Sequence, residues 1–170
     1  AAEKNLQWIK NRYKLPPGRF ELVVSDVKDL EKNLPASSSA GGGGPANSYD
    51  CVVTEGTLGP AYTEPPDEKE AAKNFKGLEK LHLAGFRAIH KILKPGKRAV
   101  AALPAYRTGG KYIFFPGVDK IQKIGYDIVT PVPEAVLEKY PFLEVTPRNS
   151  IIYDRKDQFV SREVFIFKRT

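Results

Sequence analysis

The stretch Tyr49-Asp50-Cys51-Val52-Val53-Thr54-Glu55-Gly56-Thr57-Leu58-Gly59-Pro60 combines the pattern of a buried strand with that of a turn. Its apolar run, Cys51-Val52-Val53, is typical of a strand buried in a parallel sheet. Gly56 and Gly59 then interrupt the pattern, and Pro60 ends it. We therefore expect Glu55 at the carboxyl end of a buried strand, where open α/β sheets bind their ligands. From the spacing alone, Glu55 could equally begin a solvated loop.

Strand and helix patterns alternate on both sides of this stretch. Such alternation predicts an α/β fold with a mostly parallel sheet, and a closing pair of strands adds an antiparallel hairpin. The expected helices are residues 1–14, 27–34, 67–93, 117–124 and one within 131–140. The expected strands are residues 20–24, 51–53, 98–104, 112–115 (a strand or a loop wall), 126–129, 150–153 and 163–167.

The length and the low-complexity segment indicate how the chain is organised. We expect residues 1–170 to form one domain, with a flexible loop over residues 35–47 that contains four consecutive glycines. An engineered linker is the alternative for that loop. With 41% apolar and 28% charged residues the composition is that of an ordinary globular protein. No apolar run reaches membrane-spanning length and no signal-peptide pattern is present, so we expect no membrane association.

The cysteine and histidine content restricts the chemistry. Cys51 is the only cysteine, so an internal disulfide is excluded and a reducing cytoplasm fits. Because Cys51 lies in an apolar run, we expect a buried packing thiol rather than a nucleophile. His82 and His90 are the only histidines, and no metal site is expected.

The formal net charge of +7 is concentrated near the two ends of the chain. Residues 1–20 carry five basic and one acidic side chain, and residues 146–170 carry six and three. Such a distribution suits a polyanionic partner bound near the two ends of the chain. An ordinary solvated surface is the alternative.

The stretch from Val53 to Pro60 resembles a motif of the Rossmann-like S-adenosylmethionine-dependent methyltransferases. Val53-Thr54-Glu55-Gly56-Thr57-Leu58-Gly59-Pro60 is similar to the Val-Thr-Glu-Pro-Tyr-Leu-Gly-Pro form of the amino-methyltransferase motif, usually written Asp/Asn-Pro-Pro-Tyr/Phe. Residues 153–163 resemble the end of the tRNA guanine-N2 methyltransferases whose relatives carry a THUMP RNA-binding domain. Asn5-Leu6-Gln7-Trp8-Ile9, followed by Ser25-Asp26-Val27, also fits that family. The resemblance covers nearly all of this chain, but only the later part of the family's catalytic domain.

This resemblance implies an enzyme that transfers a methyl group from S-adenosylmethionine to an exocyclic base amine of RNA, first of all guanine N2 of tRNA. It implies that the Glu55 carboxylate and the Gly56 carbonyl accept the hydrogens of that amine. It also implies cofactor contacts from Glu55, Asp26 and Val27, with Asp26 taking the amino group of the adenine. For Asp26 the alternative is the N-cap of the helix expected over 27–34.

The same resemblance implies substrate contacts from Thr57, Leu58, Tyr62 and Arg155. Thr57-Leu58 replaces the aromatic residue of the motif on which the target base stacks, and Gly56 replaces a proline. Tyr62 or Phe115 could take the place of that aromatic residue, with packing as the alternative for Phe115. For Arg155 and Arg162 the alternative to an RNA phosphate is an ion pair within the closing hairpin.

The glycine-rich first loop of the family has no counterpart in this sequence. Gly41-Gly42-Gly43-Gly44 is no substitute, because it does not follow a strand and open a helix. We therefore expect a methyltransferase sheet without its N-terminal strands, in a chain that is a fragment or is completed by another segment, with an upstream RNA-binding domain as one candidate partner. The alternatives are a non-catalytic nucleic-acid-binding module with a degenerate methyltransferase fold and an adenine-N6 DNA methyltransferase.

Overall fold

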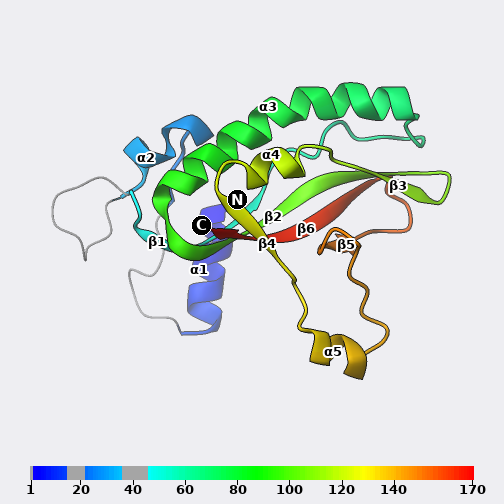
Figure 1. The fold of residues 1–170 in the computed structure, drawn as a ribbon. Helices are drawn as coiled ribbons and strands as arrows, with labels where there is room; N and C mark the ends of the chain where they lie inside the picture. The colour runs from blue at the N-terminus through cyan, green and yellow to red at the C-terminus, as the bar shows by residue number, and fades with distance from the viewer. Residues whose placement is uncertain (1, 15–21, 36–45) are drawn as a thin grey trace.

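The computed structural model describes residues 2–14, 22–35 and 46–170 (Figure 1). Its helical elements are α1 (Ala2–Arg12), the 3-10 turn η1 (Val27–Asp29), α2 (Leu30–Asn33), α3 (Glu68–Ile92), α4 (Val118–Gln122) and α5 (Glu134–Lys139). Its strands are β1 (Tyr49–Glu55), β2 (Leu93–Thr108), β3 (Lys111–Phe114), β4 (Tyr126–Val129), β5 (Ile151–Tyr153) and β6 (Val160–Arg169).

The described strands form one mixed sheet in the order β1-β2-β6-β4, with β3 paired to β2 and β5 paired to β6. β1 runs parallel to β2, whereas β3 and β6 run antiparallel to β2. Because β4 and β5 are both antiparallel to β6, four of these six strands share one direction. The predicted α/β class and the antiparallel hairpin at the end of the chain are confirmed.

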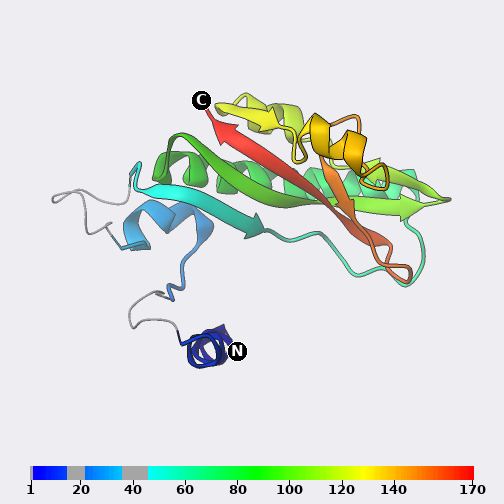
Figure 2. The ribbon, with the colours of Figure 1, turned by 90° about the horizontal axis from the view of Figure 1, so that it is seen from below.

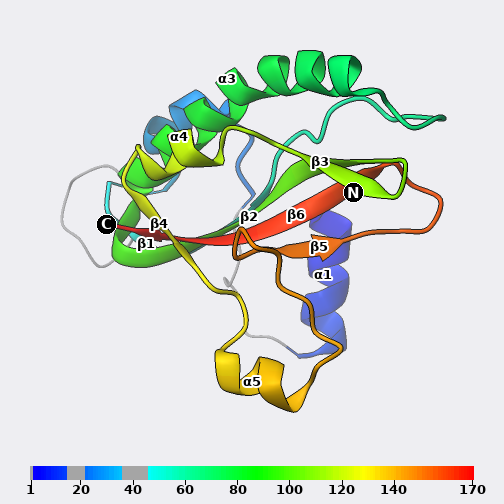
Figure 3. The same cartoon turned by 45° about the vertical axis from the view of Figure 1, so that its right-hand side comes forward.

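The two faces of the sheet are covered differently (Figures 1 and 3). α3 and α4 lie across one face, whereas α5 and α1 lie on the other side. Figure 2, seen from below, shows α1 standing away from the sheet, and neither α1 nor α5 has a buried residue. We call the side opposite α3 the open face.

The core lies between α3 and the sheet because α3 carries one apolar stripe. The helix begins where the Asp67 carboxylate accepts a hydrogen bond from the Glu70 amide at 2.8 Å, as an N-cap does. Phe75 stacks on Tyr106 of β2, and Phe86 meets Phe167 of β6 edge-on. The residues of this core cluster are buried, and the removal of their apolar surface from water is the main contribution to the stability of such a fold.

Two predictions about the sheet were wrong. β1 is not buried: Val53 is 78% exposed and Cys51 is exposed too, because β1 is the outermost strand of the described sheet. Cys51 is therefore not a packing thiol. The strand expected over 20–24 does not form in its described part, since residues 22–24 have no strand structure and are exposed. Residues 20 and 21, and 36–45 of the expected loop, lie outside the described residues.

The helix predictions agree with the structure to within a few residues at each end. Among the described helices, none is long and apolar enough to cross a membrane.

Candidate functional site

The loop after β1, residues 56–62, is fixed by side chains from the elements around it. His82 of α3 donates a hydrogen bond from Nε2 to the Thr57 carbonyl at 3.1 Å, which requires the proton on that nitrogen. The Tyr106 hydroxyl of β2 donates to the Leu58 carbonyl at 2.9 Å. Burial lowers the pKa of His82 and raises the pKa of Tyr106 to about 12. Both groups are therefore neutral at pH 7, and both hold the loop as neutral donors.

Two glycines let the loop approach these donors. A Cβ at Gly56 would lie 2.9 Å from Cε1 of His82, so the imidazole occupies the space that a proline or any other side chain would need. Gly59 has φ +100, and a Cβ there would lie 2.2 Å from the Tyr106 hydroxyl oxygen. The glycine that replaces the proline of the motif is thus explained by the packing of His82 against the loop.

Glu55, the last residue of β1, forms a two-pronged ion pair with Arg162 of β6. Arg162 donates from Nε to Oε2 at 2.9 Å and from Nη2 to Oε1 at 3.0 Å. The Glu55 side chain is 47% exposed and the Arg162 side chain is 28% exposed. The hydrogen bonds from Arg162 hold the pKa of Glu55 below its usual value, so the carboxylate is ionised and fixed in direction.

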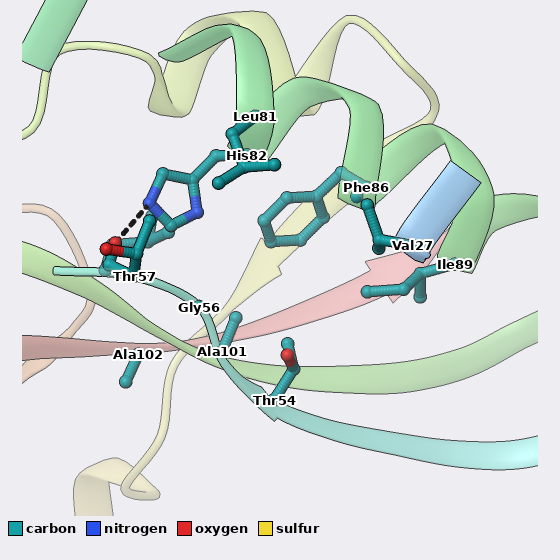
Figure 4. Close-up of a pocket in the computed structure, with 12 residues that line it drawn as sticks. Val27, Thr54, Gly56, Thr57, Leu81, His82, Phe86, Ile89, Ala101 and Ala102 are labelled. Atoms are coloured by element: carbon teal, nitrogen blue, oxygen red, sulfur yellow. Dashed lines mark hydrogen bonds between the residues drawn. The ribbon is translucent and has the colours of Figure 1, made fainter. Parts of the chain in front are cut away.

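Register places this ion pair on the open face. Glu55 lies opposite Ala102 of β2, and Thr54 lies opposite Ala101. Figure 4 shows the side chains of Thr54 and Ala101 pointing toward α3 and that of Ala102 pointing away. Because side chains alternate along a strand, Glu55 points away from α3.

A cavity of about 180 Å³ lies on the other face, between α3, η1 and the strands β1 and β2 (Figure 4). Most of its walls are apolar, and its polar groups are few. The apolar lining includes Val27, Leu81, Phe86, Ile89 and Leu103, and the polar residues are Thr54, Thr57 and His82.

This cavity does not fit a whole molecule of S-adenosylmethionine. Ligand sites for molecules of such size usually measure about 300–1,000 Å³. Asp26 is not among the residues that line the cavity: it is exposed, and its Oδ1 caps η1 by accepting from the Lys28 amide at 2.9 Å. The predicted N-cap alternative for Asp26 is therefore the one observed. Val27 does line the cavity, which has room for a flat heterocycle such as adenine.

A second cavity of about 360 Å³ lies between the loop 58–62 and the segment 157–162. Leu58 and Tyr62 form one wall, and Gln158, Phe159 and Arg162 form the other. Its volume falls in the range of ligand sites. Through Arg162, this cavity adjoins the Glu55 carboxylate. We call it the Arg162 cleft.

The predicted substrate residues are divided among three places. Leu58 and Tyr62 line the Arg162 cleft, Thr57 lines the cavity beneath α3, and Arg155 is not among the lining residues of either. The Tyr62 hydroxyl accepts from Asn74, and its ring packs edge-on against Tyr106 with 5.4 Å between centroids.

Phe115 is fully buried, so of the two roles considered for it, packing is the one that the structure shows. Its ring packs edge-on against Phe75 and His82, which makes it a core residue. Sequence reasoning missed Phe159 and Gln158 in the Arg162 cleft, and Tyr153 beside Arg162. The signal for Phe159 was an aromatic residue within an otherwise polar turn.

Comparison with known protein families and with curated proteins finds no match. Among solved structures, the chain is similar to TTHA0409 of Thermus thermophilus, described as a candidate DNA modification methylase, in its complex with S-adenosyl-L-methionine. Identity is 19% over 86% of this chain and 54% of that chain, with a TM-score of 0.44. The cytosine-N4-specific PvuII DNA methyltransferase is 12% identical over 74% of this chain and 44% of that one, with a TM-score of 0.34. The chain thus spans about half the length of these proteins.

Proposed function

We propose that this protein is an S-adenosylmethionine-dependent methyltransferase that acts on an exocyclic base amine of nucleic acid, with guanine N2 of tRNA as the first candidate. One observation carries the proposal: an ionised carboxylate at the carboxyl end of β1 is held by Arg162 beside a cleft of about 360 Å³. The similarity of Val53–Pro60 to the amino-methyltransferase motif supports the same assignment.

The carboxylate suits the chemistry of such an amine. The lone pair of an exocyclic amine is delocalised into the base, so the nitrogen is a poor nucleophile until acceptors bind its hydrogens. An ionised carboxylate has about four lone-pair positions, and a two-pronged arginine uses two of them. Because the Glu55 side chain is 47% exposed, the remaining positions can accept from an incoming amine. Arg162 thus fixes and ionises the acceptor without saturating it.

The Arg162 cleft is the proposed site of the acceptor nucleoside. Leu58, Tyr62 and Phe159 offer apolar and aromatic walls for the base and sugar. The side-chain amide of Gln158 carries both donors and an acceptor, which is the pairing that base edges require.

The cofactor would supply an activated methyl group. Among the described residues, the cavity lined by Val27 and Thr57 is too small for the whole cofactor and is matched in volume by its adenine. We therefore expect this chain by itself to bind S-adenosylmethionine weakly.

The test is transfer of a labelled methyl group by the natural protein isolated from its own cells with a C-terminal tag. The substrates are tRNA, single-stranded DNA and duplex DNA, and the labelled nucleoside is identified by digestion and mass spectrometry. N2-methylguanosine in tRNA supports the proposal in full. A methylated amine of DNA adenine or cytosine keeps the reaction and changes the substrate, whereas no label in any nucleic acid ends the proposal.

Glu55→Gln, introduced at the native gene, tests the role of the carboxylate. The amide keeps the size of the side chain but loses the negative charge, so we expect label incorporation to drop about 100-fold. Glu138→Gln is the matched control, because Glu138 is an exposed glutamate on α5 that lines neither cavity. Equal activity of the two variants would contradict the assignment of Glu55.

A second candidate is a nucleic-acid-binding module without catalysis. The small volume of the cavity beneath α3 and the engagement of both Glu55 oxygens by Arg162 favour it. In that case calorimetry with a version of the chain extended upstream detects no binding of S-adenosylmethionine at millimolar concentration. RNA binding persists, and for each neutralised phosphate its association constant falls by about 0.7 to 0.9 logarithmic units per tenfold rise in salt concentration.

A further inference from the structure

We propose that Tyr153, together with Arg155 and Arg162, is a stacking platform for an unpaired base next to the acceptor nucleotide. This inference rests on the proposed function for the position of the acceptor. It adds a second binding position, outside the Arg162 cleft, and it names the ligand as single-stranded nucleic acid.

Tyr153 is an exposed aromatic residue adjacent to the Glu55–Arg162 pair. It ends β5 and lies directly opposite Arg162 of β6, so both side chains leave the same face of the sheet. The Arg162 guanidinium carbon is 5.8 Å from the centre of the Tyr153 ring, while its Nε is 2.9 Å from Glu55. One arginine side chain therefore links the ring to the proposed acceptor carboxylate.

The ring has free surface for a base. Tyr153 is 47% exposed, and it belongs neither to the core cluster nor to the residues packed against it. The guanidinium carbons of Arg155 and Arg162 lie 5.7 and 5.8 Å from its centroid, within the roughly 6 Å of a cation–π contact, so both cations border the ring. Arg155 is fixed at the hydroxyl end of the ring, where its Nε donates to the Tyr153 oxygen at 3.2 Å. Even with both arginines beside it, Tyr153 stays 47% exposed, so part of the ring is accessible to a base.

The charges around the ring suit a phosphate backbone. Arg155 and the next residue, Lys156, are both exposed. The nearby acid Asp154 is turned to other partners: it forms an ion pair with Arg107 at 3.1 Å and accepts from Tyr112 and Ser161. Cations next to an open aromatic ring are the combination with which proteins hold single strands.

The ligand must be unpaired, because the faces of bases in a duplex are already stacked on their neighbours. Stacking on a protein ring is sequence-tolerant, since every base has a π-face. Tyr153 would therefore hold a flanking base of any type. The choice of the modified base would be left to the cleft.

The test measures binding of a short oligonucleotide with 2-aminopurine in place of one base, without cofactor, so that it does not depend on methyl transfer. We expect Tyr153→Leu to weaken binding about 5- to 150-fold and to abolish the quenching of 2-aminopurine fluorescence. Tyr153→Phe keeps the ring and should bind within about twofold of the wild type. Retention of binding by Tyr153→Phe also separates a stacking role from loss of the fold.

Tyr140→Leu is the matched control. Tyr140 is 39% exposed and has a cation, Lys139, 5.3 Å from its ring, but it lines neither of the two cavities. We expect this variant to bind as the wild type does. Arg155→Gln should reduce the slope of log affinity against log salt by about 0.7.

Wild-type affinity in Tyr153→Leu, an equal loss in Tyr140→Leu, or no binding by the wild type would each overturn the platform. The two proposals can fail separately. If binding depends on Tyr153 but no methyl transfer is found, the platform is supported and the proposed methyltransferase function is rejected. Methyl transfer that is insensitive to Tyr153→Leu does the reverse.

Discussion

Two consecutive residues of β6, Arg162 and Glu163, each belong to a glutamate–arginine pair, and the two pairs differ in burial and in the pKa of the carboxylate. Arg162 binds Glu55, which is exposed on the open face. The next residue, Glu163, is fully buried and lies 3.1 Å from Arg148. Alternation along the strand separates the two pairs, and the register partner of Glu163, Leu103, lines the cavity beneath α3.

The pKa values of the two carboxylates shift in opposite directions. Hydrogen bonds from Arg162 lower the pKa of Glu55. Burial raises the pKa of Glu163, although Ser150 donates to it at 2.7 Å and Arg148 is close. The contact between Arg148 and Oε2 of Glu163 is an ion pair without the alignment of a hydrogen bond. Glutamate and arginine thus form an exposed pair with an ionised acceptor in one place and a buried structural pair in the other. The difference follows from how much water reaches each carboxylate.

The largest expected effect is on the buried pair. Arg148→Met leaves the Glu163 carboxylate buried without its counter-ion and removes the hydrogen bond from Arg148 to the Phe115 carbonyl. We expect the free energy of unfolding at pH 7 to fall by about 3–5 kcal/mol, measured by urea denaturation. Arg87→Met, at an exposed position of α3, is the control and should change it by less than about 0.5 kcal/mol.

The second effect concerns the exposed pair and appears in activity. Arg162→Met leaves Glu55 without the donors that fix its direction, so we expect the rate of methyl transfer to fall about tenfold, or about 1.4 kcal/mol. The acidic limb of the pH–rate profile should move up, toward the ordinary pKa of 4.5, because Arg162 no longer lowers the pKa of Glu55. An unchanged acidic limb would show that Glu55 does not take part in the reaction.

The third effect is the pH dependence of stability, which should have opposite signs at the two carboxylates. The folded state binds a proton more tightly than the unfolded state at Glu163, so its contribution to stability falls as pH rises above 4.5. At Glu55 the folded pKa is the lower one, and its contribution falls as pH drops below 4.5. Unfolding of Glu163→Gln and Glu55→Gln between about pH 3 and 7, each compared with the wild type, measures both slopes. Slopes of the same sign would break the distinction between the pairs.

The smallest effect is salt screening. A double-mutant cycle of Glu55→Gln and Arg162→Met should give a coupling energy of about 0.2–1 kcal/mol, because the pair is partly exposed. At about 1 M salt that coupling should shrink, whereas the coupling between Glu163 and Arg148 should persist, since buried pairs are screened much less. Equal salt sensitivity in the two cycles would contradict their difference in burial.

Local patterns were enough to predict most of the elements. The long helix expected over 67–93 and the strand expected over 126–129 follow from local patterns, and each is present to within a residue at either end. The exposure of β1 could not be predicted in this way, because Cys51-Val52-Val53 is apolar whether or not another strand covers its outer edge.

The candidate site was predictable in its position but not in its contacts. Residue patterns located Glu55 at the end of a strand, which the structure shows. Its partner Arg162 is 107 residues away, and His82 reaches the loop from α3 across 25 residues. Such contacts depend on how strands and helices pack, and no local spacing encodes them.

The opposite orientation of Arg162 and Glu163 also fixes how β6 can sit in the sheet. A slip of one residue against β2 would turn the Arg162 guanidinium toward the apolar packing and send the Glu163 carboxyl into water. The first change would bury an unpaired charge, and the second would break the buried ion pair with Arg148. Both costs oppose a shift in register. The register of β6, an interior strand of the sheet, is thereby fixed by two adjacent side chains of opposite charge.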